Sequence, residues 1–372
     1  MSEYQYYEFQ ALDRPLTASE QAYISSLSSR VQLSATNAIF TYSYGDFRCE
    51  PKEVLEKCFD IMLYMANWGT RQLMFRFPKT VVAPSVFEPY CLADKITVSS
   101  SKNYVIVDIS IQDEEYGDWI EGEGWLAKLV QLRDDILQGD YRVFYLAWLK
   151  AASIAIEEGE DEEDLVEPPV PANLKKLPDA IGTFIELFDI DQDLIASASQ
   201  VSIDKKENTE PIKEWITALS SEEKDYFLLK LATGEINVGI QLINRLRELF
   251  KIRKSDSNYD THRRSFSQLL ENANEQMQQL QQREKLAAQQ EKIRKLEVLA
   301  KNQDKVWSDI YKLLEFKQSK TYDQAVAHLI DLRELAEYQG KLEEFKASIK
   351  QMQKNYSTRN GLLSRLKKVG LL

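Results

Sequence analysis

Cysteine and histidine are both scarce in this sequence. The three cysteines, Cys49, Cys58 and Cys91, are too few and too scattered for a disulfide framework, so a reducing cytoplasm is the expected location. The two histidines, His262 and His328, fall in a region predicted to be helical. Neither a histidine-dependent catalytic triad nor a multi-histidine metal site is therefore expected.

Long apolar runs are missing as well. A membrane-spanning helix needs about 18 or more apolar residues, and the nearest candidate, 145–156, is too short and contains Lys150. The first residues, MSEYQYYEF, have neither a basic start nor an apolar signal core. The sequence thus predicts neither a membrane protein nor a secreted one.

Nucleotide-binding and hydrolase motifs are also lacking. The sequence contains no G-x-x-x-x-G-K-[ST] and no G-x-S-x-G. Residues 122–127 formally match G-x-G-x-x-A, but Glu121 and Glu123 would repel a pyrophosphate. Residues 189–193 resemble half of a calcium loop, but Leu194 stands where that loop requires glycine. We therefore predict no cofactor, no metal and no small-molecule ligand.

Charge is divided unevenly along a chain whose formal net charge is −12. Residues 261–372 contain 21 Lys and Arg against 14 Asp and Glu, a balance of +7, and the rest of the chain carries −19. The acidic part repels nucleic acid. The basic part could contact a phosphate backbone, an acidic protein or the acidic part of its own chain, although solvated helix faces explain the same pattern.

Residues 1–156 predict an α+β domain with a mixed sheet, because strand and helix patterns interleave irregularly. A capping box at Thr17 and Glu20 opens a helix, and apolar spacings of three and four predict another from Pro51 to just before Gly69. Further helices are expected at 125–137 and 141–156, and strands at 3–11, 37–44, 71–77, 95–99 and 104–109.

The segment 157–171 marks the clearest boundary in the sequence. Eight acidic residues between Glu157 and Glu167 precede three prolines, which predicts an extended, self-repelling linker. Residues 172–256 then predict a small all-helical domain. Within it, a capping box at Ser220 and Glu223 opens a helix that places Phe227, Leu228 and Leu231 on one side.

Residues 257–317 predict one long, charged, glutamine-rich helix. An apolar residue recurs every seven positions at Leu286, Ile293, Ala300, Trp307 and Leu314, which is a seam for another helix. The seam changes phase near residue 283. We expect Leu286–Leu314 to pack on 322–356, and the glutamine-rich half to be the freer end. Residues 318–372 predict a helical hairpin that turns at Gly340, followed by a basic amphipathic helix.

Two exposed-aromatic segments are candidate docking sites. Trp68 and Arg71 lie at an expected helix–strand junction, although a turn with Trp68 packed beneath it is an alternative. The acidic loop 113–123 contains a second group: Asp118, Trp119, Glu121 and Glu123. Aromatic residues amid charge often anchor interfaces, but this loop could also be a solvated face or hold a hard cation.

Four basic residues near the end of the sequence are candidate contacts for a phosphate backbone. They are Arg359, Arg365, Lys367 and Lys368.

The segments 6–17 (YYEFQALDRPLT) and 67–71 (NWGTR) resemble those of an uncharacterised bacterial family. The segment from YDQAVAHLIDLRELAEYQG to LLSRLKKVGL is similar to the tail of bacterial SWIM-type zinc-finger proteins, but the zinc motif is missing. This resemblance implies membership of a multi-protein system that includes SWIM-type proteins and helicase-like ATPases. It implies no role for any residue.

The main hypothesis is a non-enzymatic subunit of a bacterial complex whose partners are other protein subunits. The second is a nucleic-acid-associated accessory protein that binds through the basic C-terminal region. The third is a hydrolase built on the carboxylates of 113–123.

Overall fold

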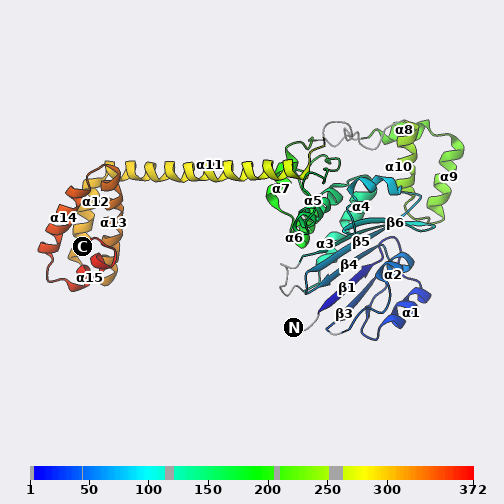
Figure 1. Ribbon diagram of the computed structural model, residues 1–372, viewed down its shortest axis with the longest axis horizontal. Helices are drawn as coiled ribbons and strands as arrows, with labels where there is room; N and C mark the ends of the chain where they lie inside the picture. The colour runs from blue at the N-terminus through cyan, green and yellow to red at the C-terminus, as the bar shows by residue number, and fades with distance from the viewer. Residues whose placement is uncertain (1–3, 44, 114–120, 205–209, 251–262) are drawn as a thin grey trace. The chain divides into compact units, whose positions relative to one another are not determined.

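The computed structural model describes residues 4–43, 45–113, 121–204, 210–250 and 263–372 (Figure 1). The chain forms two compact units, Met1–Gln276 and Met277–Leu372. Helix α11 (Phe266–Lys301) begins in the first unit and ends in the second. The units divide inside this helix, which differs from the boundary expected at 157–171.

A seven-stranded sheet organises the N-terminal unit, in the order β2-β3-β1-β4-β5-β7-β6. Its strands are β1 (Gln5–Gln10), β2 (Gln32–Leu33), β3 (Asn37–Tyr42), β4 (Ile61–Ala66), β5 (Thr70–Pro78), β6 (Ile96–Ser100) and β7 (Tyr104–Gln112). The α+β class is confirmed. Every neighbouring pair is antiparallel, so the expected mixed sheet is wrong in that respect. The reason is that β1 lies between β3 and β4, which run in the same direction but do not pair.

The region predicted as one helix, from Pro51 to just before Gly69, contains a helix followed by a strand. Helix α2 covers only Pro51–Cys58, and Ile61–Ala66 forms β4. Strand β4 lies between β1 and β5 and contributes side chains to the cores on both faces of the sheet, so nearly every position in it is apolar. Such a run has no alternation, and its spacing cannot distinguish a buried strand from a helix.

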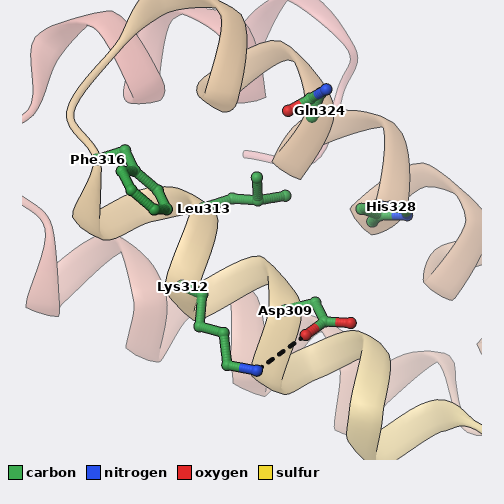
Figure 2. Close-up of a pocket in the computed structure, with 6 residues that line it drawn as sticks. All are labelled: Asp309, Lys312, Leu313, Phe316, Gln324 and His328. Atoms are coloured by element: carbon green, nitrogen blue, oxygen red, sulfur yellow. Dashed lines mark hydrogen bonds and ion pairs between the residues drawn. The ribbon is translucent and has the colours of Figure 1, made fainter.

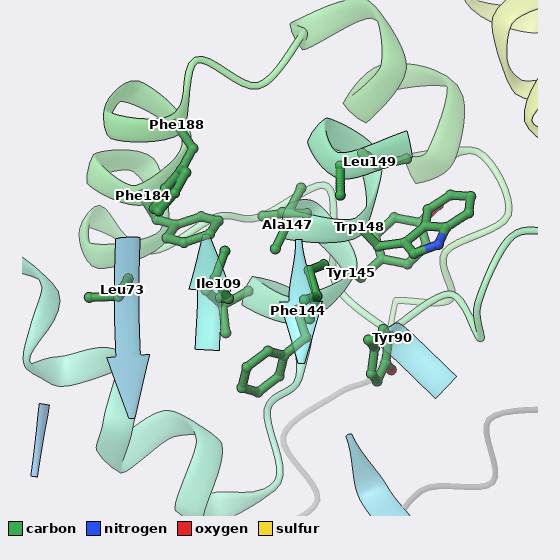
Figure 3. Packing of buried hydrophobic residues seen from close by; sticks show 14 of the residues in the cluster. Leu73, Tyr90, Ile109, Phe144, Tyr145, Ala147, Trp148, Leu149, Phe184 and Phe188 are labelled. Carbon is green, nitrogen blue, oxygen red and sulfur yellow. The ribbon is translucent and has the colours of Figure 1, made fainter. Parts of the chain in front are cut away.

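Helices cover both faces of the sheet (Figure 1). Helices α1 (Ala18–Leu27) and α2 bury a smaller core that contains Phe9, Phe40 and Met62. The larger core on the opposite face is formed by α3 (Trp125–Leu129), α4 (Gln131–Gln138), α5 (Arg142–Glu157), α6 (Asp179–Phe188) and α7 (Gln192–Ser199). Figure 3 shows Phe144 and Phe184 among the residues that fill it. Because α6 and α7 belong to this core, 172–256 is not a separate helical domain.

The second half of the expected linker is folded. Leu165, Pro168 and Pro169 are buried, and the Glu167 side chain is only 4% exposed. Its carboxylate accepts hydrogen bonds from the Arg264 guanidinium at 2.7 and 2.8 Å and from the Tyr145 hydroxyl. The prediction of an extended linker depended on the run of acidic residues, and this run ends at Asp164. The residues after Asp164 are therefore free to fold.

This carboxylate fixes the beginning of α11. The backbone at 165–167 pairs with the backbone at 264–266, through Glu167 N–H to Arg264 O at 2.9 Å and Phe266 N–H to Leu165 O at 2.8 Å. Burial and the neighbouring Glu167 raise the pKa of the Tyr145 hydroxyl well above its ordinary value. Burial alone would lower the pKa of Arg264, but Glu167 raises it above its ordinary value.

A second buried network lies at one end of the sheet's central strands, where β1 ends and β4 begins. The Asp60 carboxylate accepts hydrogen bonds from the backbone N–H of Leu12 at 2.7 Å and of Asp13 at 3.0 Å, and from the Arg76 guanidinium at 2.8 Å. Arg133 of α4, whose side chain is 1% exposed, binds Asp13 through two bonds of 2.9 Å. Burial would raise the pKa of Asp60, but Arg133 and Arg76 lower it below its ordinary value.

Three short helices complete the N-terminal unit: α8 (Ile212–Ala218), α9 (Ser221–Ala232) and α10 (Val238–Leu249). Trp215, Leu219 and Leu246 form their small shared core. Two amides tie α10 to the sheet region. Asn237 Nδ2 donates to Asp13 Oδ2 at 3.3 Å, and Asn244 Nδ2 donates to the Val81 carbonyl at 3.0 Å.

The C-terminal unit packs the end of α11 with α12 (Gln303–Glu315), α13 (Ser319–Tyr338), α14 (Leu342–Asn355) and α15 (Asn360–Lys368). The predicted turn at Gly340 is confirmed. Gly340 has φ +70°, and Lys341 N–H donates to Ala336 O at 2.7 Å, as expected when a left-handed residue ends a helix.

The predicted single long helix is interrupted at Asn302, where φ is −113°. Leu296, Ile310 and Leu314 are buried with residues of α13 and α14, which confirms the expected packing for that part. Leu286, however, is 57% exposed, so the packing does not extend to it. Residues 278–292 are all exposed, as expected for the glutamine-rich half.

We predict that Asp60→Asn lowers the free energy of unfolding by about 3 to 5 kcal/mol. The reason is that the guanidinium groups of Arg76, at 2.8 Å, and Arg133, at 3.5 Å, lose the carboxylate that they share. Asp94→Asn, at a side chain that is 92% exposed, is the matched control and should change stability by less than about 0.5 kcal/mol. Urea unfolding measures both.

The Asp60 network also predicts that the free energy of unfolding depends on pH. The pKa of Asp60 is lower in the folded chain than in the unfolded chain, so protonation favours unfolding. Its contribution is complete above about pH 4 and is lost as the pH falls through the folded-state pKa. A wild-type chain and an Asp60→Asn variant that lose stability equally between neutral pH and pH about 3 would contradict this assignment.

We also predict that Glu167→Gln destabilises the N-terminal unit by about 3 kcal/mol, since Arg264 then lacks its counter-charge. Hydrogen exchange at 264–273 should become faster than in wild type. Glu163→Gln, an exposed acidic residue of the same segment, is the control. Equal protection of 264–273 in the two variants would show that Glu167 does not hold α11.

Candidate functional site

The NWGTR segment forms the turn between β4 and β5. Trp68 is 40% exposed, which agrees with a surface contact rather than with packing beneath the turn. Arg71 is only 6% exposed, and its guanidinium donates to the Leu187 carbonyl at the end of α6. Arg71 is therefore not an exposed docking residue. It satisfies a carbonyl that the end of a helix leaves without an intrahelical partner.

The acidic loop is described only in part. Asp118 and Trp119 lie outside the described residues, and Glu121 and Glu123 are exposed on either side of Gly122. Gly122 lies against the Tyr6 ring, where a Cβ would come within 2.2 Å of a ring carbon. Within the part of the chain that the structure describes, no three acidic, cysteine or histidine side chains are placed to hold a metal ion.

The four basic residues of the C-terminal region divide into two groups. Arg359 donates to the Leu314 carbonyl and lies over the Tyr356 ring, 4.6 Å from its centroid. Arg365 binds Asp323 at 2.5 Å and the Ser319 hydroxyl at 2.6 Å. Both arginines thus hold α15 or its approach to the rest of the unit. Lys367 and Lys368 are exposed, as a phosphate contact requires.

Figure 2 shows a shallow depression between α12 and α13. Lys312 and Asp309 form an ion pair beside it, in which Lys312 Nζ lies 3.1 Å from Asp309 Oδ1. Phe316 at its rim is 65% exposed. The lining residues are Asp309, Lys312, Leu313, Phe316, Gln324 and His328. This mixture gives no specific indication of a ligand.

The strongest candidate surface was not among the predicted sites. Helix α9 exposes four large apolar side chains, which we call the α9 apolar face: Tyr226 (54%), Leu228 (62%), Leu229 (65%) and Leu231 (56%). Only Phe227 of this helix is buried. The sequence pattern had placed Phe227, Leu228 and Leu231 on one side, whereas the structure turns Phe227 inward and the leucines outward.

The polar side chains of α9 explain this orientation. Ser220 and Glu223 form a capping box, and Glu223 also accepts hydrogen bonds from Arg245 of α10 at 2.8 and 3.0 Å. Lys230 Nζ binds Glu235 Oε1 and Gln241 Oε1, each at 2.8 Å. The polar contacts therefore face α10 and leave the three leucines on the outside, whereas Tyr226 has Lys230 Nζ 4.7 Å from its ring centroid. An apolar run interrupted by a single lysine, YFLLKLA, was the signal available in the sequence.

Comparisons with protein-family models, with curated proteins and with solved structures find no match to this chain. Among the helices that the structure describes, none combines the length and the apolar character needed to cross a membrane.

We predict that Arg71→Ala lowers the free energy of unfolding by about 2 kcal/mol, because a charge-assisted hydrogen bond to a buried carbonyl is lost. Trp68→Ala, three residues away, should change stability by less than about 1 kcal/mol because its side chain is partly solvated. Thermal unfolding of the two variants measures the difference. The assignment of Arg71 to the fold is wrong if Trp68→Ala is the more damaging change.

Proposed function

We propose that this protein is a non-enzymatic interaction subunit of a multi-protein complex, and that it binds another polypeptide through the α9 apolar face. The observation that carries the proposal is the exposure of three leucines and a tyrosine on one short helix. Contiguous apolar surface on a soluble protein marks an interaction site, whereas single exposed apolar residues need no explanation.

Energetics support this interpretation. Fully burying a leucine stabilises a protein by about 1.5 to 3 kcal/mol relative to exposure. The α9 apolar face forgoes most of that gain for each of its leucines, while the small shared core of α8–α10 uses Trp215, Leu219 and Leu246 instead. A partner that covers α9 would recover it. Tyrosine is also enriched among the residues that dominate binding energy in interfaces.

The position of α9 suits a docking element. Figure 1 shows α9 at the periphery of the N-terminal unit, with α10 next to it. Because α10 is tied to the sheet region through Asn237 and Asn244, a rigid support holds the exposed helix. We place this interaction in the cytoplasm, in keeping with the free thiols of Cys49, Cys58 and Cys91.

Nucleic-acid binding by the C-terminal unit is the weaker alternative. Lys367 and Lys368 favour it because both are exposed at the end of α15. Arg359 and Arg365 do not, because their guanidinium groups are engaged within the unit.

A photoreactive amino acid placed at Leu229 in the native host tests the proposal. We predict one discrete crosslinked product of increased mass, because the side chain at this position lies in the interface. The same amino acid at Ser19, which is exposed on α1, is the control.

The predicted product at position 229 should disappear when Leu228→Gln and Leu231→Gln are added, and position 19 should give no such product. Equal, diffuse crosslinking at positions 229 and 19 would refute the proposed function.

A further inference from the structure

We infer that the occupant of the α9 apolar face is an amphipathic helix of another protein that carries Lys or Arg beside its apolar side. This inference rests on the proposed function and specifies its partner. Two observations carry it: the arrangement of the apolar side chains on one convex helix, and the sign of the charges next to them.

The apolar side chains form helical rows. Tyr226 and Leu229 are three residues apart, as are Leu228 and Leu231, so each pair forms part of a ridge with a groove beside it. The ridges of a second helix fit such grooves. Because successive residues are rotated by about 100°, Tyr226 and Leu228 lie on opposite sides of the axis. One crossing helix therefore meets the three leucines, which span about 5 Å along the axis.

The charges next to this face are negative. Glu222 and Asp225 are exposed at its N-terminal end, and among the residues that the structure describes neither forms an ion pair. Glu222 lies in the first turn, where a carboxylate stabilises the helix. Asp225 lies beyond that turn, so the helix dipole does not account for it. A cationic side chain on the partner would account for the exposed Asp225 carboxylate.

Neither lysine of α9 pairs with Glu222 or Asp225 in the part of the chain that the structure describes, although Lys230 Nζ lies 4.7 Å from the centroid of the Tyr226 ring. Lys224 Nζ donates to the Thr217 carbonyl at 3.1 Å, and Lys230 Nζ is held by Glu235 and Gln241. The α9 apolar face therefore presents leucines together with uncompensated carboxylates. Complementary charge on a partner speeds association and excludes partners of the same sign.

This charge pattern disfavours two other occupants. A second copy of the same face would bring further carboxylates to the interface without cations to match them, and like charges in contact oppose association. An anionic membrane surface would repel Glu222 and Asp225, since such surfaces attract Lys and Arg. A basic amphipathic helix meets both the apolar and the electrostatic requirement.

The test uses the full-length protein and two labelled synthetic peptides with the same amphipathic leucine pattern. One peptide carries lysine at its polar positions and the other glutamate. We expect the leucine–lysine peptide to bind at least about tenfold more tightly than the leucine–glutamate peptide, as measured by fluorescence anisotropy.

Two variants locate the binding. The combination Leu228→Gln, Leu229→Gln and Leu231→Gln keeps the net charge and should weaken the leucine–lysine peptide at least about tenfold. The pair Glu222→Gln and Asp225→Asn keeps the leucines and should weaken it about fivefold while reducing its salt dependence. The three leucines are 56% to 65% exposed, and Glu222 and Asp225 are exposed as well, so circular dichroism should show an unchanged fold.

Other outcomes overturn the inference. Binding of the leucine–lysine peptide that survives the three leucine substitutions would be attraction to the acidic chain in general. Equal binding of the two peptides would remove the requirement for a cation. A dimer of the wild-type protein in sedimentation that the three leucine substitutions abolish would make a second copy the occupant and overturn the inference. Co-sedimentation with vesicles of phosphatidylcholine and phosphatidylserine that these substitutions abolish would make a membrane the occupant and overturn it too.

Failure here is distinguishable from failure of the proposed function. If position 229 crosslinks to another polypeptide in the host but the two peptides bind alike, α9 is an interface and only its partner class is wrong. A crosslink from position 229 to a second copy, or within the same chain, likewise overturns the partner and not the involvement of α9. Without a discrete crosslink, both proposals fall.

Discussion

The N-terminal unit depends on one buried carboxylate, that of Asp60. A buried carboxylate is tolerated only when it is paired and hydrogen-bonded, and Asp60 meets this condition with two backbone N–H groups and the Arg76 guanidinium. Arg133 extends the network from α4 to Asp13, and Asn237 extends it to α10. The helix that supports α9 is thus connected through polar contacts to the end of the sheet's central strands, where β1 ends and β4 begins. In this way the fold holds an exposed apolar helix in a fixed place.

Three candidate arginines form contacts within the fold, although only Arg71 is buried. Arg71, Arg359 and Arg365 all looked like surface contacts because arginine is usually exposed. In the structure, Arg71 and Arg359 donate to main-chain carbonyls near helix ends, and Arg365 pairs with Asp323. A guanidinium group has five donors in a fixed geometry, so it suits such positions well. The sequence shows its charge, but the neighbouring carbonyl comes from a residue far along the chain: Leu187 for Arg71, and Leu314 for Arg359.

The candidate site was predictable only in part, and for a related reason. The run YFLLKLA after the capping box at Ser220 predicts a helix that is apolar on most sides, and such a helix is normally buried. Its exposure follows from Arg245, Gln241 and Glu235, which bind the polar side chains of α9 and so fix its rotation. Two of these partners belong to α10. Helical spacing gives the composition of each side, but it does not say which side meets a neighbour.

The sequence by itself determined the α+β class, the helical C-terminal half, both capping boxes and the turn at Gly340. Each of these follows from a local rule, such as the need for a left-handed residue after α13. Only the tertiary structure decided that 61–66 is a strand, that Leu165 and 167–169 are buried and that the leucines of α9 are exposed. The physical reason is the same in all three cases. Burial is a property of what lies opposite a residue, and those neighbours come from β1 and β5, from Arg264 and Tyr145, and from α10.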